Sequence, residues 1–253
     1  MKQYKNLFLF LAITFLLPLI LVFLQIHTEN LTLKFVLYGI EAAAPSIVAL
    51  SMIAYNRKLA FFFKENFKTQ KLKEAIILPV IMSFATMFLA KIIACFLLRE
   101  SFAVGSISNS QLIIILWAFI AEEFGWRGYL FPCLKKQMRQ PLFAPLIVGV
   151  IWCFWHYHYF LFGGMDVPFV WFFIGCIVES YIYVYLLDWS NNCLLSSMVY
   201  HVTWNLFIHV FAMNPADNNG NVLPYIVVMV LEIIIFIVIL SVKKDNRWKI
   251  IKK

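Results

Sequence analysis

The chain has 253 residues, of which 63% are apolar and only 13% are charged, and its mean hydropathy is +0.83. Soluble domains usually carry roughly 25% charged residues, so this composition excludes an ordinary soluble domain and predicts an integral membrane protein. The formal net charge is +8. The basic residues are spread through short loops between apolar runs, so we expect a protein held in a lipid bilayer and no nucleic-acid partner.

Eight apolar runs follow one another along the chain, and each is about 20 residues long, the length that crosses a hydrocarbon core as a helix. They do not alternate with period two, which favours helices over a membrane barrel. The predicted spans are 6–26, 35–55, 75–97, 111–133, 142–162, 168–188, 193–213 and 223–242. We therefore predict an all-α, polytopic membrane bundle of about eight transmembrane helices in a single domain covering residues 1–253. We interpret the first run as a retained span, because no small-residue cleavage site follows it.

The Lys and Arg residues between the runs indicate how the bundle is oriented. Seventeen of them lie at the two chain ends and in the loops after the second and fourth runs, whereas the opposite loops hold only Lys34 and Arg99. Loops rich in Lys and Arg stay in the cytoplasm. The distribution predicts a multi-pass protein of the cell membrane with both termini cytoplasmic. The short loops and the Lys-, Ile- and Phe-rich composition indicate a bacterial chain.

Ionisable side chains within three of the apolar runs are candidates for function, because each one costs free energy in a bilayer. Run 111–133 carries Glu122, Glu123 and Arg127, run 142–162 carries His156, and run 193–213 carries His201 and Asn205. The rise of a helix per residue places these side chains near the middle of the membrane. They must lie at a similar depth if they are to form one site. The alternative is a buried polar network that only holds helices together.

Helix geometry separates the roles of the two glutamates. Glu123 and Arg127 are four residues apart, so they share a helix face and are predicted to pair, which removes two lone charges from the apolar interior. Glu122 points elsewhere and is predicted to be the freer carboxylate, as a general base requires. His201 and Asn205 are also four residues apart and share a face.

Several other ionisable residues belong to no motif. Four of them, in or near the runs, are interpreted as structural groups that line a cavity or pair with one another: Glu41, Lys91, Glu179 and Glu232. Two histidines near the outer ends of their runs, His158 and His209, are interpreted as residues at the membrane interface.

Three motifs on successive apolar runs resemble a known family. Residues 122–127 read EExxxR, residues 152–156 read aromatic-xxxH, and residues 201–205 read HxxxN. In this order they resemble the CPBP family of CAAX-processing and bacteriocin-processing intramembrane endopeptidases, also called the Abi or Rce1-like family. The resemblance covers the core at about 111–213. The second motif departs from the family pattern, because Trp152 stands where the family prefers phenylalanine.

The resemblance implies a role for each residue. Glu122, helped by His156, would activate a water molecule that attacks a peptide carbonyl, and His201 and Asn205 would donate hydrogen bonds to the oxyanion. Glu123 and Arg127 would support Glu122. The resemblance favours a mechanism without a cofactor. Zinc held by Glu122, His156 and His201 stays an alternative, because these are good zinc ligands, although the HExxH spacing is absent.

The predicted function is that of an intramembrane endopeptidase acting on membrane-associated peptides or proteins. Two substrate classes stay open, namely prenylated C-termini of the CAAX type and small peptides in bacteriocin processing or self-immunity. We favour the second for a bacterial chain. Two other functions compete with the enzyme: a proton-coupled transporter, for which the expected internal symmetry is not visible in the sequence, and a non-catalytic immunity or scaffold protein.

Overall fold

The computed structural model describes residues 2–68, 70–138, 140, 142–162 and 164–245. All regular elements in this part of the chain are helical, so the protein is an all-α, polytopic helix bundle. Five of the basic residues used to predict the orientation lie outside the described residues: Arg139, Arg247, Lys249, Lys252 and Lys253. The elements are α1 (Lys2–Ile26), α2 (Leu31–Ala42), α3 (Ala44–Tyr55), α4 (Leu59–Asn66), α5 (Leu72–Leu98), α6 (Asn109–Ala121), α7 (Glu123–Gly125), the π-helical turn η1 (Trp126–Leu130), α8 (Phe131–Gln137), α9 (Phe143–Trp155), α10 (Tyr157–Phe162), α11 (Phe169–Trp189), α12 (Leu195–Val210), the 3-10 turn η2 (Pro215–Asp217) and α13 (Leu223–Asp245).

The described helices do not confirm the predicted number of eight spans. Five helical stretches are long and apolar enough to cross a bilayer: Tyr4–Ile26, Leu72–Leu98, Phe143–Phe162, Phe169–Trp189 and Leu223–Ser241. Helices α2 and α3 pass the same test only as a pair bent by 62°. The described residues therefore supply five spans, or six with the bent pair, and the count of eight is not confirmed. Run 111–133 is divided among α6, α7, η1 and α8, and run 193–213 contains the 16-residue helix α12.

Two of the helix interruptions pack against each other. Pro45 lies in the first turn of α3, and its missing N–H weakens the connection back to α2. A Cβ atom at Gly125 would lie 2.5 Å from the carbonyl carbon of Pro45. Only glycine allows α7 to approach the start of α3 so closely. The chain therefore breaks between α6 and α7, at Glu122, where it meets the α2–α3 bend.

A third interruption occurs at His156, between α9 and α10. The backbone of His156 has φ −74° and ψ 2°, and Trp155 before it is fully buried. Helix α9 is held closely against α11, because a Cβ atom at Gly149 would lie only 2.7 Å from the carbonyl oxygen of Cys176. Two motif residues, Glu122 and His156, thus stand where helices end.

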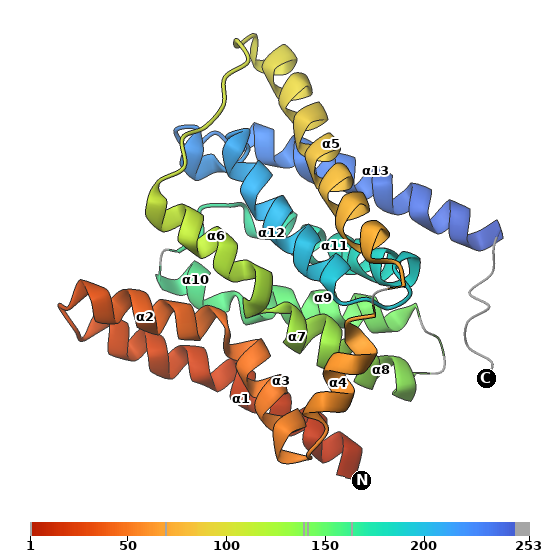
Figure 1. Ribbon diagram of the computed structural model, residues 1–253. Coiled ribbons are helices and arrows are strands. Elements are labelled where there is room, and N and C mark those ends of the chain that lie inside the picture. The colour runs from red at the N-terminus through yellow and green to blue at the C-terminus, as the bar shows by residue number, and fades with distance from the viewer. Residues whose placement is uncertain (1, 69, 139, 141, 163, 246–253) are drawn as a thin grey trace.

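The helices share one overall direction, and their connections gather at two ends (Figure 1). The start of α1, the α3–α4 turn, α8 and the end of α13 lie toward the lower right of the view, whereas the α1–α2 turn, the α5–α6 loop and α10 lie toward the upper left. Helix α12 packs against α5 and α6, and α11 packs against α9 and α13. The motif-bearing helices α9 and α12 therefore pack against other helices of the bundle, whereas α6 leaves Ile113 and Leu116 exposed.

Candidate functional site

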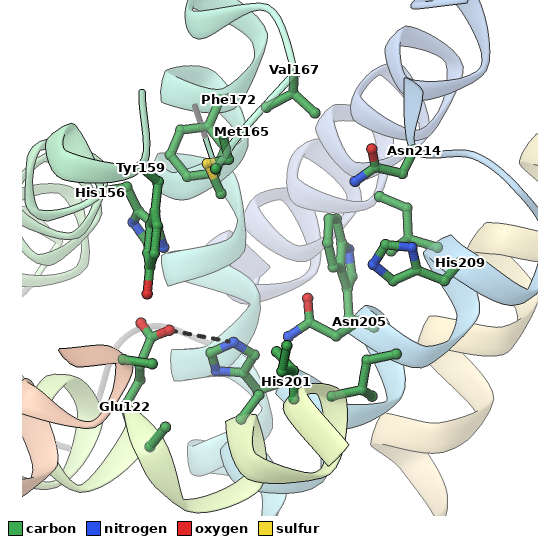
Figure 2. A pocket seen from close by; sticks show the side chains of 18 of the residues that line it. Glu122, His156, Tyr159, Met165, Val167, Phe172, His201, Asn205, His209 and Asn214 are labelled. Carbon is green, nitrogen blue, oxygen red and sulfur yellow. Dashed lines mark ion pairs between the residues drawn. The ribbon is translucent and has the colours of Figure 1, made fainter. Parts of the chain in front are cut away.

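A cavity of about 310 Å³ contains four of the six motif residues, Glu122, His156, His201 and Asn205. They come from three places, namely the break after α6, the end of α9 and the middle of α12. Figure 2 shows Glu122 and His201 side by side at the deep end, with Asn205 beside His201. The sequence prediction that these side chains meet agrees with this arrangement, while the role of each residue stays a proposal.

The Glu122 carboxylate is held by one of its two oxygens. Its Oε2 accepts hydrogen bonds from the indole N–H of Trp126, at 2.9 Å, and from that of Trp152, at 2.6 Å. Its Oε1 lies 3.9 Å from Nε2 of His201. That separation is too long for a direct hydrogen bond and suits a bridging water molecule or substrate oxygen. One oxygen is thus fixed by two hydrogen bonds, and the other faces His201.

Trp152 makes a contact with Glu122 that the motif resemblance did not suggest. Its indole N–H donates to Glu122, and its ring lies against those of Tyr183 and His201. Phenylalanine, which the resemblance leads one to expect here, has no N–H to donate. Trp126 was also missed, although its position four residues after Glu122 on a helical segment is a signal for contact.

Glu123 and Arg127 form the predicted ion pair, with Nη1 of Arg127 2.9 Å from Oε1 of Glu123. Both side chains are buried behind the cavity. The guanidinium carbon also lies 3.7 Å from the centre of the Tyr183 ring and 4.3 Å from that of Trp152. The arginine thus connects Glu123 to the wall that carries Trp152.

Glu123 makes a second contact that helix geometry alone could not predict. Its Oε1 lies 2.9 Å from Nδ1 of His201 on α12. A carboxylate paired with Arg127 is an acceptor, so Nδ1 of His201 donates to it. This contact fixes the ring and turns its other nitrogen, Nε2, toward Glu122. The first and third motifs are therefore joined directly.

His156 is oriented by its own helix. Its Nδ1 lies 2.8 Å from the carbonyl oxygen of Trp152, and because a carbonyl only accepts, Nδ1 carries the proton. In the neutral ring Nε2 is then free to accept a hydrogen bond. The ring packs against Trp155 and Phe172. Figure 2 also shows the hydroxyl of Tyr159 pointing toward Glu122, another wall residue that no motif indicated.

The interpretation of His158 as an interfacial residue is wrong. Its side chain is only 1% exposed, and its Nε2 lies 2.9 Å from Oε1 of Glu41. Glu41 also accepts a hydrogen bond from Gln25. Gln25 of α1, Glu41 of α2 and His158 of α10 thus lie together inside the protein. His209 pairs with Asp217 at 2.6 Å, near the rim of the cavity.

Three residues interpreted as structural line cavities or pair with neighbours. Glu179 of α11 lines the cavity that holds Glu122. Glu232 of α13 is fully buried and accepts a hydrogen bond from the indole N–H of Trp204, at 2.5 Å. Lys91 lines a second cavity, between the end of α5 and the loop before α13. Within the described part of the chain, no three His, Cys, Asp or Glu side chains are grouped closely enough to hold a metal ion.

Comparison with known proteins gives two matches. Residues 104–207 match the family model described as type II CAAX prenyl endopeptidase, Rce1-like. The chain is also 28% identical over 193 residues to the CAAX prenyl protease 2 of Methanococcus maripaludis, an alignment that covers 64% of this chain and 68% of that protein. The family match contains all six motif residues and ends within α12.

Proposed function

From the match of residues 104–207 to the Rce1-like family model and the similarity to a CAAX prenyl protease, we propose that this chain is an intramembrane endopeptidase of that family and hydrolyses peptide bonds with a water molecule activated by Glu122. The observation that carries the proposal is the geometry of this carboxylate. One oxygen is anchored by two indole N–H groups, and the other faces His201 across a gap of 3.9 Å. A water molecule in that gap is within reach of the base that must take its proton.

The proposed reaction proceeds in two stages. Glu122 takes a proton from the water, and the oxygen bonds to the carbonyl carbon while Nε2 of His156 accepts the second water hydrogen in a hydrogen bond. Asn205, and a His201 ring that carries both protons, donate to the resulting oxyanion. The tetrahedral intermediate then collapses, the carbon–nitrogen bond breaks, and Glu122 returns its proton to the leaving amine. The contact between Glu123 and Nδ1 of His201 supports this orientation of the ring.

The substrate class belongs to the same proposal. The relative from Methanococcus maripaludis carries the name CAAX prenyl protease 2, so prenylated C-termini are one class. We favour small membrane-associated peptides, processed in bacteriocin maturation or self-immunity, because the composition and short loops indicate a bacterial chain.

Membrane proteomics on cells that express the wild-type chain or Glu122→Gln tests the function without a known substrate. The proposal predicts at least one peptide that is cleaved in wild-type cells and accumulates intact with the variant. Glu65→Gln is the matched control, since Glu65 is a partly exposed carboxylate of α4 paired with Lys68 at 3.2 Å. Identical peptide populations for wild type and Glu122→Gln, at equal protein level, would contradict the proposal.

The zinc alternative has its own test. Glu122, His156 and His201 line one cavity, but two of their nitrogens are engaged elsewhere, Nδ1 of His156 by a carbonyl and Nδ1 of His201 by Glu123. We propose a reaction that needs no metal. Loss of peptidase activity in a zinc chelator, with recovery on adding zinc, would overturn that part of the proposal.

A further inference from the structure

The cavity lies in one half of the helix bundle. Its described walls come from α6 up to Glu122, the end of α9, the first half of α11 and the second half of α12, with further residues from α2, α10 and the start of α13. Its rim is formed by Gly164–Val167, in the α10–α11 connection, and by Asn214 and Ala216, before and within η2. Figure 2 shows Val167 and Asn214 at the end of the cavity opposite Glu122. The opening therefore faces the end of the bundle that carries these two connections.

The opposite end is closed by packed side chains. Just beyond Glu122, Trp126 and Leu130 of η1 and Leu194 before α12 are all 0% exposed. The ring of Phe124 lies about 6 Å from those of Phe63 and Phe67. Among the described residues, none of those that line the cavity belongs to α4, η1 or α8. Glu122 is thus at the floor of the cavity, which is closed beyond it.

Charge distinguishes the two ends. The described segments around the closed end carry eight basic and three acidic residues: Arg57, Lys58, Lys64, Lys68, Lys71, Lys73, Lys135, Lys136, Glu65, Glu74 and Asp188. The segments around the open end carry two basic and four acidic residues: Lys34, Arg99, Glu29, Glu100, Asp166 and Asp217. Because Lys and Arg are concentrated on the cytoplasmic side of membrane proteins, the closed end is the cytoplasmic one.

From this geometry we infer that the cavity opens to the extracytoplasmic face and that its substrate is a polypeptide segment that has already been carried across the membrane. The inference rests on the proposed endopeptidase function and adds the side from which the substrate arrives. The reaction that supplies the substrate is therefore translocation or membrane insertion. Cleavage follows export.

The cavity also limits the form and charge of the segment. Glu122 follows the 13 residues of α6, which at about 1.5 Å per residue places it up to about 20 Å below the outer end of that helix. An extended chain advances about 3.3 Å per residue, so about six residues must enter to reach Glu122. The charged lining residues in the described chain are Glu122, Asp166 and Glu179, with no Lys or Arg. This lining favours neutral or basic segments over acidic ones.

Cysteine accessibility in intact cells tests the inference. Ala216→Cys places a thiol on the exposed rim, and Lys64→Cys places one on exposed α4 at the closed end. A membrane-impermeant maleimide should label Ala216→Cys in intact cells and Lys64→Cys only after permeabilisation, above the background of the five native cysteines in the parent chain. Asp166→Cys, on the other rim segment, repeats the test if Ala216→Cys does not fold. The reverse labelling pattern would overturn the inference.

A second arm connects accessibility to proteolysis. The maleimide at Ala216→Cys should abolish processing of the peptide found by proteomics in intact cells, whereas the same reagent on cells with Lys64→Cys should leave processing at the parental rate. Equal processing in both would contradict access through the rim. The outcome separates this inference from the proposed function, because loss of processing in Glu122→Gln concerns the chemistry and does not depend on which face is labelled.

Discussion

Oε1 of Glu123 lies 2.9 Å from Nδ1 of His201. The second glutamate of one motif thus holds the histidine of another, on a helix that begins 72 residues later in the chain. Because Glu123 also pairs with Arg127 at 2.9 Å, one carboxylate oxygen joins the ion pair to the proposed oxyanion donors. Glu123, Arg127 and His201 therefore form one network of polar contacts that supports the candidate site.

Removing one partner of the buried ion pair should destabilise the protein more than removing both. Glu123→Gln leaves the Arg127 charge buried without its partner, which costs about 3–5 kcal/mol. The double variant Glu123→Leu/Arg127→Met removes both charges and should recover much of that loss. Thermal unfolding in detergent measures this, and additive losses in the double variant would contradict a direct pair.

The same double variant separates stability from orientation of His201. It lacks the carboxylate that accepts from Nδ1 of His201, so its kcat should stay low even where its Tm recovers. A double variant with wild-type Tm and wild-type kcat would show that Glu123 does not position the histidine.

Trp152→Phe should weaken catalysis without removing the fold. The substitution keeps an aromatic ring against Tyr183 and His201 but removes the N–H that donates to Glu122 at 2.6 Å. A hydrogen bond to a charged group contributes about 1.5–3 kcal/mol, and the Trp126 donor remains. We expect kcat to fall about tenfold or more, as measured on purified protein. An unchanged kcat would show that the second donor is dispensable.

Asn205→Ala should lower kcat more than it lowers Tm. Asn205 lines the cavity beside His201, and loss of one oxyanion donor typically costs about 10²–10³ in kcat. Asn56→Ala is the control, because Asn56 is an exposed residue at the end of α3 whose amide bonds only its own helix. A similar decrease in kcat for both variants would point to a general effect on folding.

Gly125→Ala tests the close approach that interrupts α6. The added methyl group would lie 2.5 Å from the Pro45 carbonyl carbon, and overpacking of this kind costs about 1–3 kcal/mol. A lower Tm is expected, together with lower activity because Glu122 lies at the start of the displaced segment. Gly220→Ala is not a suitable control, since Gly220 has a φ of +80°. Gly39→Ala is suitable, because the nearest atom to its Cβ is 3.9 Å away.

Much of the site could be predicted from the sequence, for a physical reason. Polar side chains in apolar runs need polar partners, so Glu122, His156 and His201 were expected to lie together in one cavity. The four-residue spacing of Glu123 and Arg127 predicted that these two side chains pair. The all-α bundle followed in the same way from the apolar runs.

The helix interruptions could not be predicted from the sequence. The hydropathy of a run shows that its residues are apolar, but it does not show where the helix breaks or changes direction. Run 111–133 is apolar throughout, yet it breaks at Glu122 because Gly125 packs on Pro45, a contact between residues 80 positions apart. The burial of His158 depends on Glu41, which lies still farther away in the chain. Such tertiary contacts leave no local pattern, which is why the interruptions of the apolar runs and the burial of His158 were not predicted.

The most direct test of the account is the turnover of an identified peptide by purified Glu122→Gln. The substitution keeps the shape of the side chain and removes the base, so kcat/KM should fall by about 10²–10⁴, while Tm stays close to wild type and Glu65→Gln retains full activity. Wild-type turnover by a correctly folded Glu122→Gln would contradict the central claim that this carboxylate activates the water.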